Sequence, residues 1–114
     1  MMVFKRGDIV LVPFPFTDQT TIKKRPAVVI SSDHYNEILS DVIIMAVTSH
    51  IEKSFVVGEF IIKEWRSAGL LMPSSVKPVI STIEQNLILK KLGSLSSEDL
   101  ISLNKGIKEL LDLG

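Results

Sequence analysis

The sequence predicts a mainly β protein with helices, of the α+β class, and three observations lead to this prediction. Short apolar segments rich in valine and isoleucine recur along most of the chain. Turn-forming residues separate them at the spacing expected of a small barrel or sandwich. The last segment instead carries leucine and isoleucine at helical spacing, which predicts one helix packed on the sheet. With 114 residues and no visible linker, we expect a single domain over residues 1–114.

The first two strands are separated by a proline-rich segment and a polar loop. Residues 9–12 form a short apolar strand, and we expect it to stop at the proline-rich segment 13–16, where backbone donors are missing. Residues 17–24 are polar and predict a hairpin loop, which is either a mobile lid or an ordinary solvated connection. The second strand is then expected to begin at Arg25 or Pro26.

The middle of the chain predicts one short helix and several strands. Residues 32–39 begin with a capping serine and predict one or two helical turns. The apolar run 42–47 predicts a buried strand. Residues 54–62 are β-branched and aromatic with an internal glycine, which predicts a strand with a bulge or bend. The short apolar segments 69–73 and 78–83 extend the sheet.

The C-terminal segment gives the clearest helical signal. Ser96 with Asp99 three residues later resembles a capping box. Apolar residues follow at helical spacing, namely Leu100, Leu103, Ile107, Leu110 and Leu111. Gly106 lowers the helical propensity by about 1 kcal/mol relative to alanine, so we expect this helix to depend on tertiary or partner contacts.

Composition argues against several classes of function. The longest apolar run has six residues, far short of the roughly 20 needed to span a bilayer, and the N-terminal pattern is unlike a secretory signal, so we expect a cytoplasmic protein. There is no cysteine, and the two histidines are isolated, so we expect no metal and no cofactor. The formal net charge is zero, and any nucleic-acid site must therefore be local.

Polar groups gather where two predicted strands end. Three cations, Lys23, Lys24 and Arg25, adjoin the strand that follows Pro26, and Thr48, Ser49 and His50 follow the strand 42–47. Polar side chains on rigid strand ends can form a site. An arginine offers a planar fork of donors that suits phosphate oxygens. The first candidate ligand is therefore a phosphodiester.

Five segments, taken together and in order, resemble the MazF/PemK toxins. They are residues 5–10 (KRGDIV), 24–31 (KRPAVVIS), 46–49 (AVTS), 67–70 (SAGL) and 91–96 (KLGSLS). The resemblance covers nearly the whole chain. It implies a small SH3-like β-barrel closed by a C-terminal helix, a homodimer, and a ribosome-independent endoribonuclease that cuts single-stranded RNA at short sequences. It also implies an antitoxin partner.

The resemblance assigns catalysis to Arg25 and Thr48, with a 2′,3′-cyclic phosphate and a 5′-hydroxyl as products and no metal. The ribose 2′-hydroxyl is the nucleophile, so the enzyme aligns it with the phosphorus and stabilises the charge on the phosphoryl oxygens. Arginine suits the charge role but is a poor base. Some family members have an acidic residue just before the arginine, where this chain has lysine, so the general base is not carried over. His50 is a possible substitute if the strand continues through it, although a lone histidine is more often structural, and Ser49 is a possible positioning residue.

RNA binding is expected at Lys23 and Lys24 through phosphates, with Phe16 and Asp18 in the adjoining loop. Exposed lysines are often only solvated, and aromatic residues more often pack in a core. A mobile loop beside a cationic site also gives an acidic, partly disordered C-terminal segment of an antitoxin something to cover. Two alternatives stay open, because the CcdB toxins share this kind of barrel: a gyrase-binding toxin, or an inactive antitoxin-binding module.

Overall fold

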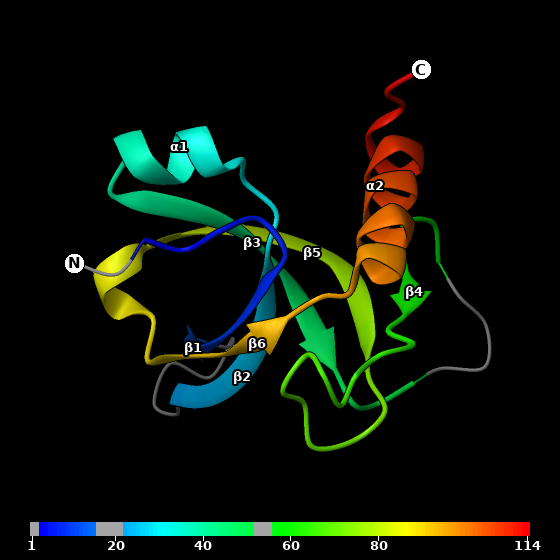
Figure 1. Cartoon of the computed structure of the whole chain (residues 1–114), viewed down its shortest axis with the longest axis horizontal. Helices are drawn as coiled ribbons and strands as arrows, with labels where there is room; N and C mark the ends of the chain where they lie inside the picture. The colour runs from blue at the N-terminus through cyan, green and yellow to red at the C-terminus, as the bar shows by residue number, and fades with distance from the viewer. Residues whose placement is uncertain (1–2, 16–21, 52–55) are drawn as a thin grey trace.

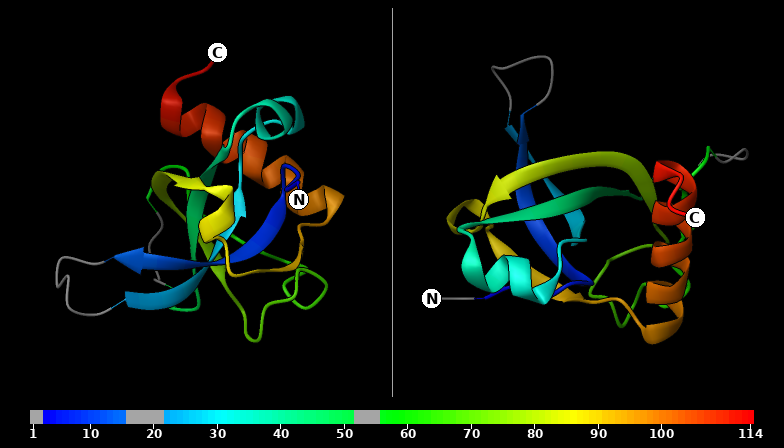
Figure 2. Two further views of the ribbon diagram at one scale, coloured as in Figure 1. Left: turned by 90° about the vertical axis from the view of Figure 1, so that its left-hand side faces the viewer. Right: turned by 90° about the horizontal axis from the view of Figure 1, so that it is seen from above.

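The computed structural model describes residues 3–15, 22–51 and 56–114. Its elements are β1 (Asp8–Pro15), β2 (Ile22–Val29), α1 (Asp33–Ile38), β3 (Asp41–Thr48), β4 (Phe60–Ile61), β5 (Ser75–Glu84), the 3₁₀ helix η1 (Gln85–Leu87), β6 (Lys90–Ser94) and α2 (Ser97–Leu111). The strands form an antiparallel sheet in the order β4-β5-β3-β2-β1-β6, which curls into a half-barrel with α2 at one end (Figures 1 and 2). The predicted fold class, a small barrel-like β-sheet with a C-terminal helix, is confirmed.

The curled sheet buries apolar side chains on both faces because successive strand residues point to opposite sides. One face packs against α2 and the segment that precedes β5, and its cluster includes Ile9, Val28, Met45, Val47, Ile62, Ala68 and Leu103. The other face is covered near the N-terminus, and its cluster includes Phe4, Val10, Val12, Val29, Val42 and Ile44. The strand ends that lie beyond both clusters are left to form the site.

The β1–β2 hairpin is longer than predicted: β1 ends three residues later than expected, and β2 begins three or four residues earlier. Pairing runs as far as Pro15 opposite Ile22. Prolines are tolerated here because the pairing of β1 with β6 ends at Leu11, whose carbonyl accepts from the Leu89 amide at 2.9 Å. Alternate residues of a strand point their backbone groups to the same side, so Pro13 and Pro15 face the same side as Leu11. Beyond Leu11 no described strand pairs with β1 on that side, so the missing N–H groups of the two prolines break no ladder bond. Residues 16–21, and with them most of the predicted loop 17–24, lie outside the described residues, and the last part of that loop, residues 22–24, belongs to β2.

Two predictions for the middle of the chain are confirmed. Helix α1 begins after Ser32, whose hydroxyl accepts from the Tyr35 amide at 3.0 Å as an N-cap. Strand β3 follows and pairs with β2 on one side and β5 on the other. The ladder between β2 and β3 ends at Ala27 opposite Ala46, so the two strands separate beyond this pair.

Three predictions between β3 and α2 were wrong or incomplete. The strand expected over 54–62 is reduced to β4, because Gly58 lies in a turn with φ +87°; residues 52–55 are outside the described part. The segment 69–73 is not a strand, since Gly69 has φ +82° and ends a turn. The segment 78–83 belongs to the longer strand β5, and β6 was not predicted.

Helix α2 begins as predicted and contacts the turn at Gly58. The Ser96 hydroxyl accepts from the Asp99 amide at 3.1 Å. Gly106 lies against this turn: a β-carbon at residue 106 would stand 2.9 Å from the Gly58 carbonyl oxygen. The glycine that weakens the helix therefore permits its close packing. Among the described residues, none of the helices has the length and apolar character needed to cross a bilayer.

Candidate functional site

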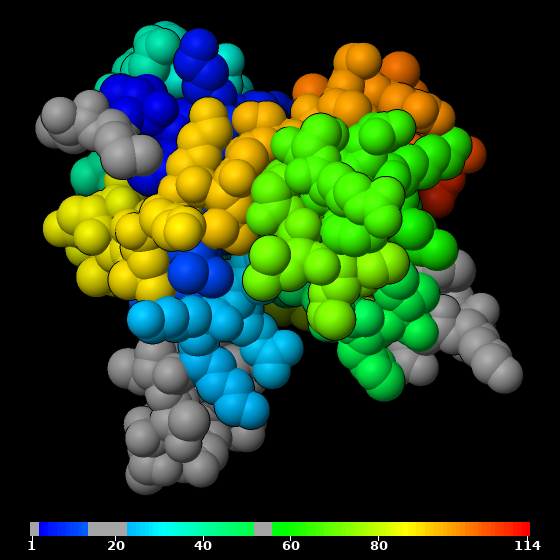
Figure 3. All heavy atoms as spheres, turned by 60° about the horizontal axis from the view of Figure 1, so that its bottom comes forward, coloured from blue at the N-terminus to red at the C-terminus, as the bar shows by residue number. Residues whose placement is uncertain are grey.

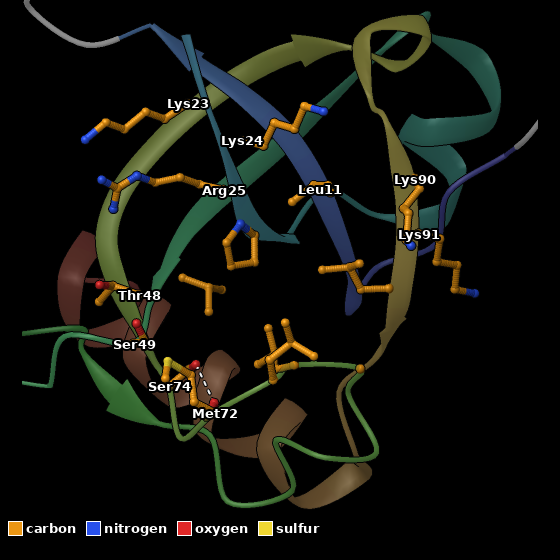
Figure 4. A pocket seen from close by; sticks show the side chains of 16 residues that line it. Leu11, Lys23, Lys24, Arg25, Thr48, Ser49, Met72, Ser74, Lys90 and Lys91 are labelled. Atoms are coloured by element: carbon orange, nitrogen blue, oxygen red, sulfur yellow. Dashed lines mark hydrogen bonds between the residues drawn. The ribbon is translucent and has the colours of Figure 1, made fainter. Parts of the chain in front are cut away.

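A groove of about 850 Å³ opens where β2, β3 and β6 end or diverge. Its walls come from β2, the end of β3, β6, and the segment 69–74 that precedes β5 (Figures 3 and 4). Leu11 of β1 lies at its centre in Figure 4. The groove therefore joins parts of the chain that are far apart in sequence, and each wall is attached to the sheet or to α2.

Arg25 and Thr48 lie on the same side of the groove, beyond the end of the ladder between β2 and β3 (Figure 4). The ladder ends at Ala27 opposite Ala46, and Arg25 and Thr48 are each two residues beyond this pair. Residues opposite each other in such a ladder project from the same face. Figure 4 shows both side chains on one side of the groove. The sheet thus places a guanidinium and a hydroxyl together without a hydrogen-bonded ladder between them.

The Thr48 hydroxyl is held by the chain that follows it. The His50 backbone amide donates to Thr48 Oγ1 at 3.1 Å. Because this bond uses a lone pair of the oxygen, the hydroxyl hydrogen can be donated to a ligand. Strand β3 ends at Thr48 and does not continue through His50, so residues 48 and 50 do not share a strand face. Ser49 lines the groove, whereas His50 is exposed and is not among the lining residues.

Five cations line the groove, and none of its described lining residues is acidic. They are Lys23, Lys24, Arg25, Lys90 and Lys91. The formal charge of the whole chain is zero, so this side is locally positive. Lys91 is paired with a neighbour outside the lining: its Nζ lies 3.3 Å from Asp8 Oδ1, and that carboxylate is buried. The remaining charge favours an anionic ligand such as a phosphodiester.

The apolar wall of the groove is the loop 63–74, which is tied down at several points. Asp99 of α2 is fully buried, and its carboxylate accepts from the Lys63 and Glu64 amides, both at 3.0 Å. The Ser74 hydroxyl donates to the Met72 carbonyl at 2.8 Å (Figure 4). Leu71 is nevertheless 96% exposed. An anchored loop with an exposed leucine provides a surface for the flat face of a base.

The loop also closes the space between β4 and β6. Gly69 packs so closely on β6 that a β-carbon there would stand 1.9 Å from the Leu92 carbonyl oxygen. On the β6 side of the same contact, a β-carbon at Gly93 would stand only 2.4 Å from the Ala68 carbonyl oxygen. Two glycines therefore allow backbone to lie on backbone, and Figure 3 shows this segment beside β6.

The structure brings together most of the predicted site residues. Lys23, Lys24, Arg25, Thr48 and Ser49 all line one groove. Phe16 and Asp18 lie outside the described residues. Trp65 packs against the core, and Arg66 lies over its ring at 4.6 Å, so the side chain is in use within the fold.

Sequence reasoning missed the far walls of the groove. Lys90 and Lys91 form a basic pair that is visible in the sequence but received no role, and the apolar segment 69–73 was interpreted as a strand. The two adjacent lysines were the feature of the sequence that could have indicated this wall. Within residues 3–15, 22–51 and 56–114, histidine and carboxylate side chains do not gather in a group of three or more that could hold a metal ion.

Comparison with solved structures places the fold among toxin nucleases and their complexes. An endoribonuclease in complex with its cognate antitoxin from a mycobacterial species superposes with a TM-score of 0.79 at 14% identity over 96% of each chain. The Form-II MazE-MazF structure from Deinococcus radiodurans has a TM-score of 0.79 at 17% identity over 100% of each chain. Mycobacterium tuberculosis toxin MazF-mt6 has a TM-score of 0.77 at 19% identity, covering 94% of this chain and 98% of that one. At these identities the likeness establishes a shared fold.

Sequence comparison gives the family. No curated protein sequence matches the chain significantly. A family model described as the PemK-like, MazF-like toxin of type II toxin-antitoxin systems matches residues 5–111, nearly the whole chain. The predicted resemblance is confirmed: the chain belongs to the PemK-like, MazF-like toxins of type II toxin-antitoxin systems.

Proposed function

We propose that this toxin is a sequence-specific, metal-independent and ribosome-independent endoribonuclease that cuts single-stranded RNA in the cytoplasm. The observation that carries the proposal is that Arg25 and Thr48 line the same side of a groove lined by cations (Figure 4). A guanidinium beside a hydroxyl offers several donors to the oxygens of one phosphate. The structural neighbours that are named endoribonucleases share this fold.

The reaction follows from what the RNA supplies and what the groove adds. The 2′-oxygen attacks the adjacent phosphorus, the bond between phosphorus and the 5′-oxygen breaks, and a 2′,3′-cyclic phosphate and a 5′-hydroxyl result. The 2′-hydroxyl loses its proton and the departing 5′-oxygen gains one. Negative charge builds on the non-bridging oxygens, where the Arg25 guanidinium stabilises it and the Thr48 hydroxyl donates a hydrogen bond. Arg25 is held within β2 and Thr48 at the end of β3, so little reorganisation is needed.

The reaction needs a base that accepts the 2′ proton. The described lining of the groove contains no histidine and no carboxylate. His50 follows Thr48 closely and donates its backbone amide to that hydroxyl, which makes it a positioning residue and a candidate base in this proposal. Ser49 lines the groove and is placed to contact the same phosphate.

The partners proposed for this toxin are RNA, an antitoxin and a second copy of the chain, and the first two are assigned to the cationic groove. Lys23 and Lys24 are exposed on β2 and are assigned to the phosphates of the RNA. Two of the structural neighbours are described as MazE-MazF complexes. We extend this to the present chain: it forms a homodimer, and an acidic, partly disordered C-terminal segment of a cognate antitoxin covers the cationic groove.

The experiment that tests the proposal is cleavage of a long single-stranded RNA in excess EDTA, with the cut ends mapped. Discrete cuts bearing 5′-hydroxyl ends are expected with the parent protein. They should be lost with Arg25→Ala and with a 2′-O-methyl substrate. Arg66→Ala is the matched control, because that arginine stacks on Trp65 and does not line the groove. If the parent protein cuts none of several unrelated RNAs, the gyrase-binding or inactive-module alternative is favoured instead.

A further inference from the structure

A row of side chains crosses three neighbouring strands on the floor of the groove. Leu11 of β1 is opposite Pro26 of β2 on one side and opposite Lys90 of β6 on the other. Opposite residues share a face, so all three project to the same side of the sheet. Lys24 is two residues before Pro26 and therefore shares that face. All four residues line the groove.

The same alternation puts Lys24 and Lys90 on a different side of the groove from the proposed catalytic pair. Lys23 and Arg25 stand on either side of Lys24 in the sequence, so their side chains project from the opposite face of β2. Figure 4 shows Lys23 and Arg25 extending to one side, and Lys24 and Lys90 lying on the other. The Cα atoms of Pro26 and Lys90 are separated by two strand spacings, about 10 Å. An anion held by Lys90 is therefore distinct from one held by Arg25.

Lys90 and Lys91 are adjacent in sequence but are not equivalent. Lys91 is opposite Val10, a buried residue of the other face, and its ammonium lies 3.3 Å from buried Asp8. That carboxylate also accepts from the Lys5 amide at 2.9 Å and the Ser94 hydroxyl at 3.2 Å. Lys91 is thus committed to a structural ion pair. Lys90 is exposed, and no ion pair involves it among the residues that the structure describes.

We propose that Lys90, together with Lys24, binds a second backbone phosphate of the RNA strand whose scissile phosphate lies at Arg25 and Thr48. This inference rests on the proposed function and adds to it a second contact, the direction in which the strand crosses β2, β1 and β6, and the division of labour between two adjacent lysines. Leu11 and Pro26 share the face of Lys24 and Lys90 and give the sugar or base an apolar floor. Lys91 takes no part, because its charge is already paired.

The test is a salt titration of binding, because contact with a phosphate does not depend on base sequence. The probe is a fluorescein-labelled, all-2′-O-methyl single-stranded RNA of mixed sequence, which binds without being cut. Removing one lysine that neutralises a phosphate of a single strand lowers the slope of log Kd against log salt by about 0.7. Lys90→Ala should lower the slope by up to about this amount, because Lys24 contacts the same phosphate, and should weaken binding severalfold at moderate salt.

Two controls remove the same charge elsewhere. Lys91→Ala removes the adjacent lysine and Lys105→Ala removes an exposed lysine of α2, and neither should change the slope. Thermal unfolding of each variant reports whether it is folded, and Lys90→Gln replaces Lys90→Ala if the alanine variant is not. In the cleavage assay, Lys90→Ala should raise KM and leave kcat nearly unchanged, since the residue does not contact the reacting atoms.

The outcomes separate this inference from the proposed function. An unchanged slope for Lys90→Ala, an equal decrease for Lys91→Ala, or a parent protein that does not bind the probe in a salt-dependent way overturns the inference. Cleavage by the parent protein together with an unchanged Lys90→Ala slope would leave the proposed function standing. The expected slopes without any cleavage would contradict the nuclease and retain the phosphate contact.

Discussion

Replacing Gly69 by alanine tests how the wall of the groove is held against β6. A β-carbon at residue 69 would stand 1.9 Å from the Leu92 carbonyl oxygen, which is backbone and cannot rotate away. The residue also has φ +82°, a conformation that costs a residue with a side chain about 1–2 kcal/mol. Separating two packed segments adds about 1–3 kcal/mol. Gly69→Ala should therefore destabilise the protein by about 2–5 kcal/mol.

Gly93→Ala examines the same contact from the other side. Its β-carbon would stand 2.4 Å from the Ala68 carbonyl oxygen, but Gly93 is not in the left-handed region, so only the packing cost of about 1–3 kcal/mol applies. Gly114→Ala is the control, since nothing lies within 4 Å of a β-carbon there and no packed segment holds its φ of +33° in place. Comparing Gly69→Ala with Gly93→Ala separates the loss of stability into a steric part and a part due to the backbone conformation of Gly69.

Thermal unfolding at one fixed protein concentration measures all three variants. With about 4 °C of Tm per kcal/mol for a chain of this size, we expect Tm to fall by about 8–20 °C for Gly69→Ala and about 4–12 °C for Gly93→Ala. Gly114→Ala should match the parent. A Gly69→Ala protein within about 2 °C of the parent, or a larger decrease for Gly93→Ala, would refute the reasoning.

Three further predictions concern α2 and the site. Gly106→Ala should destabilise the protein in spite of the better helical propensity of alanine, because the β-carbon would stand 2.9 Å from the Gly58 carbonyl oxygen. The control is Asn104→Ala, which is exposed on the same helix and should stabilise the protein by a few tenths of a kcal/mol in chemical denaturation. A stabilised Gly106→Ala protein would contradict the packing argument. Asp99→Ala should cost about 1–3 kcal/mol by leaving two loop amides without their acceptor, and an unchanged denaturation midpoint would count against this role. Thr48→Val should lower kcat of RNA cleavage by about 10²-fold with little change in KM, whereas Thr48→Ser should retain most activity; equal decreases would argue against the hydroxyl.

The elements that the sequence predicted well are those whose signal is local. The C-terminal helix begins at Ser96 because a capping hydroxyl and a periodic apolar face lie in one continuous segment. Strand β3 is a continuous apolar run, which the sequence shows directly. Strand β6 was missed because two lysines and a glycine have no strand pattern of their own, and its pairing depends on β1. Such pairing is a property of the assembled sheet.

For the site, the residue types were visible in the sequence but their arrangement was not. Arg25 lies within β2 and Thr48 at the end of β3, and their place on one side of the groove depends on the pairing of β2 with β3. The segment 69–73 is apolar and was interpreted as a strand, whereas Leu71 is exposed in the groove wall. Apolarity alone does not distinguish a core strand from a binding surface. The different fates of Lys90 and Lys91 depend on Asp8, a residue more than eighty positions away.

The prolines of the β1–β2 hairpin also limit what can assemble on it. Beyond Leu11, the backbone groups that face the open side of β1 belong to Pro13 and Pro15, so this stretch of edge offers carbonyls but no N–H donors. A peptide that adds to a sheet as an extra strand needs both. An inhibitory segment or a second copy of the chain therefore cannot extend the sheet at this edge. The same lack of donors protects the open edge from strand-to-strand aggregation.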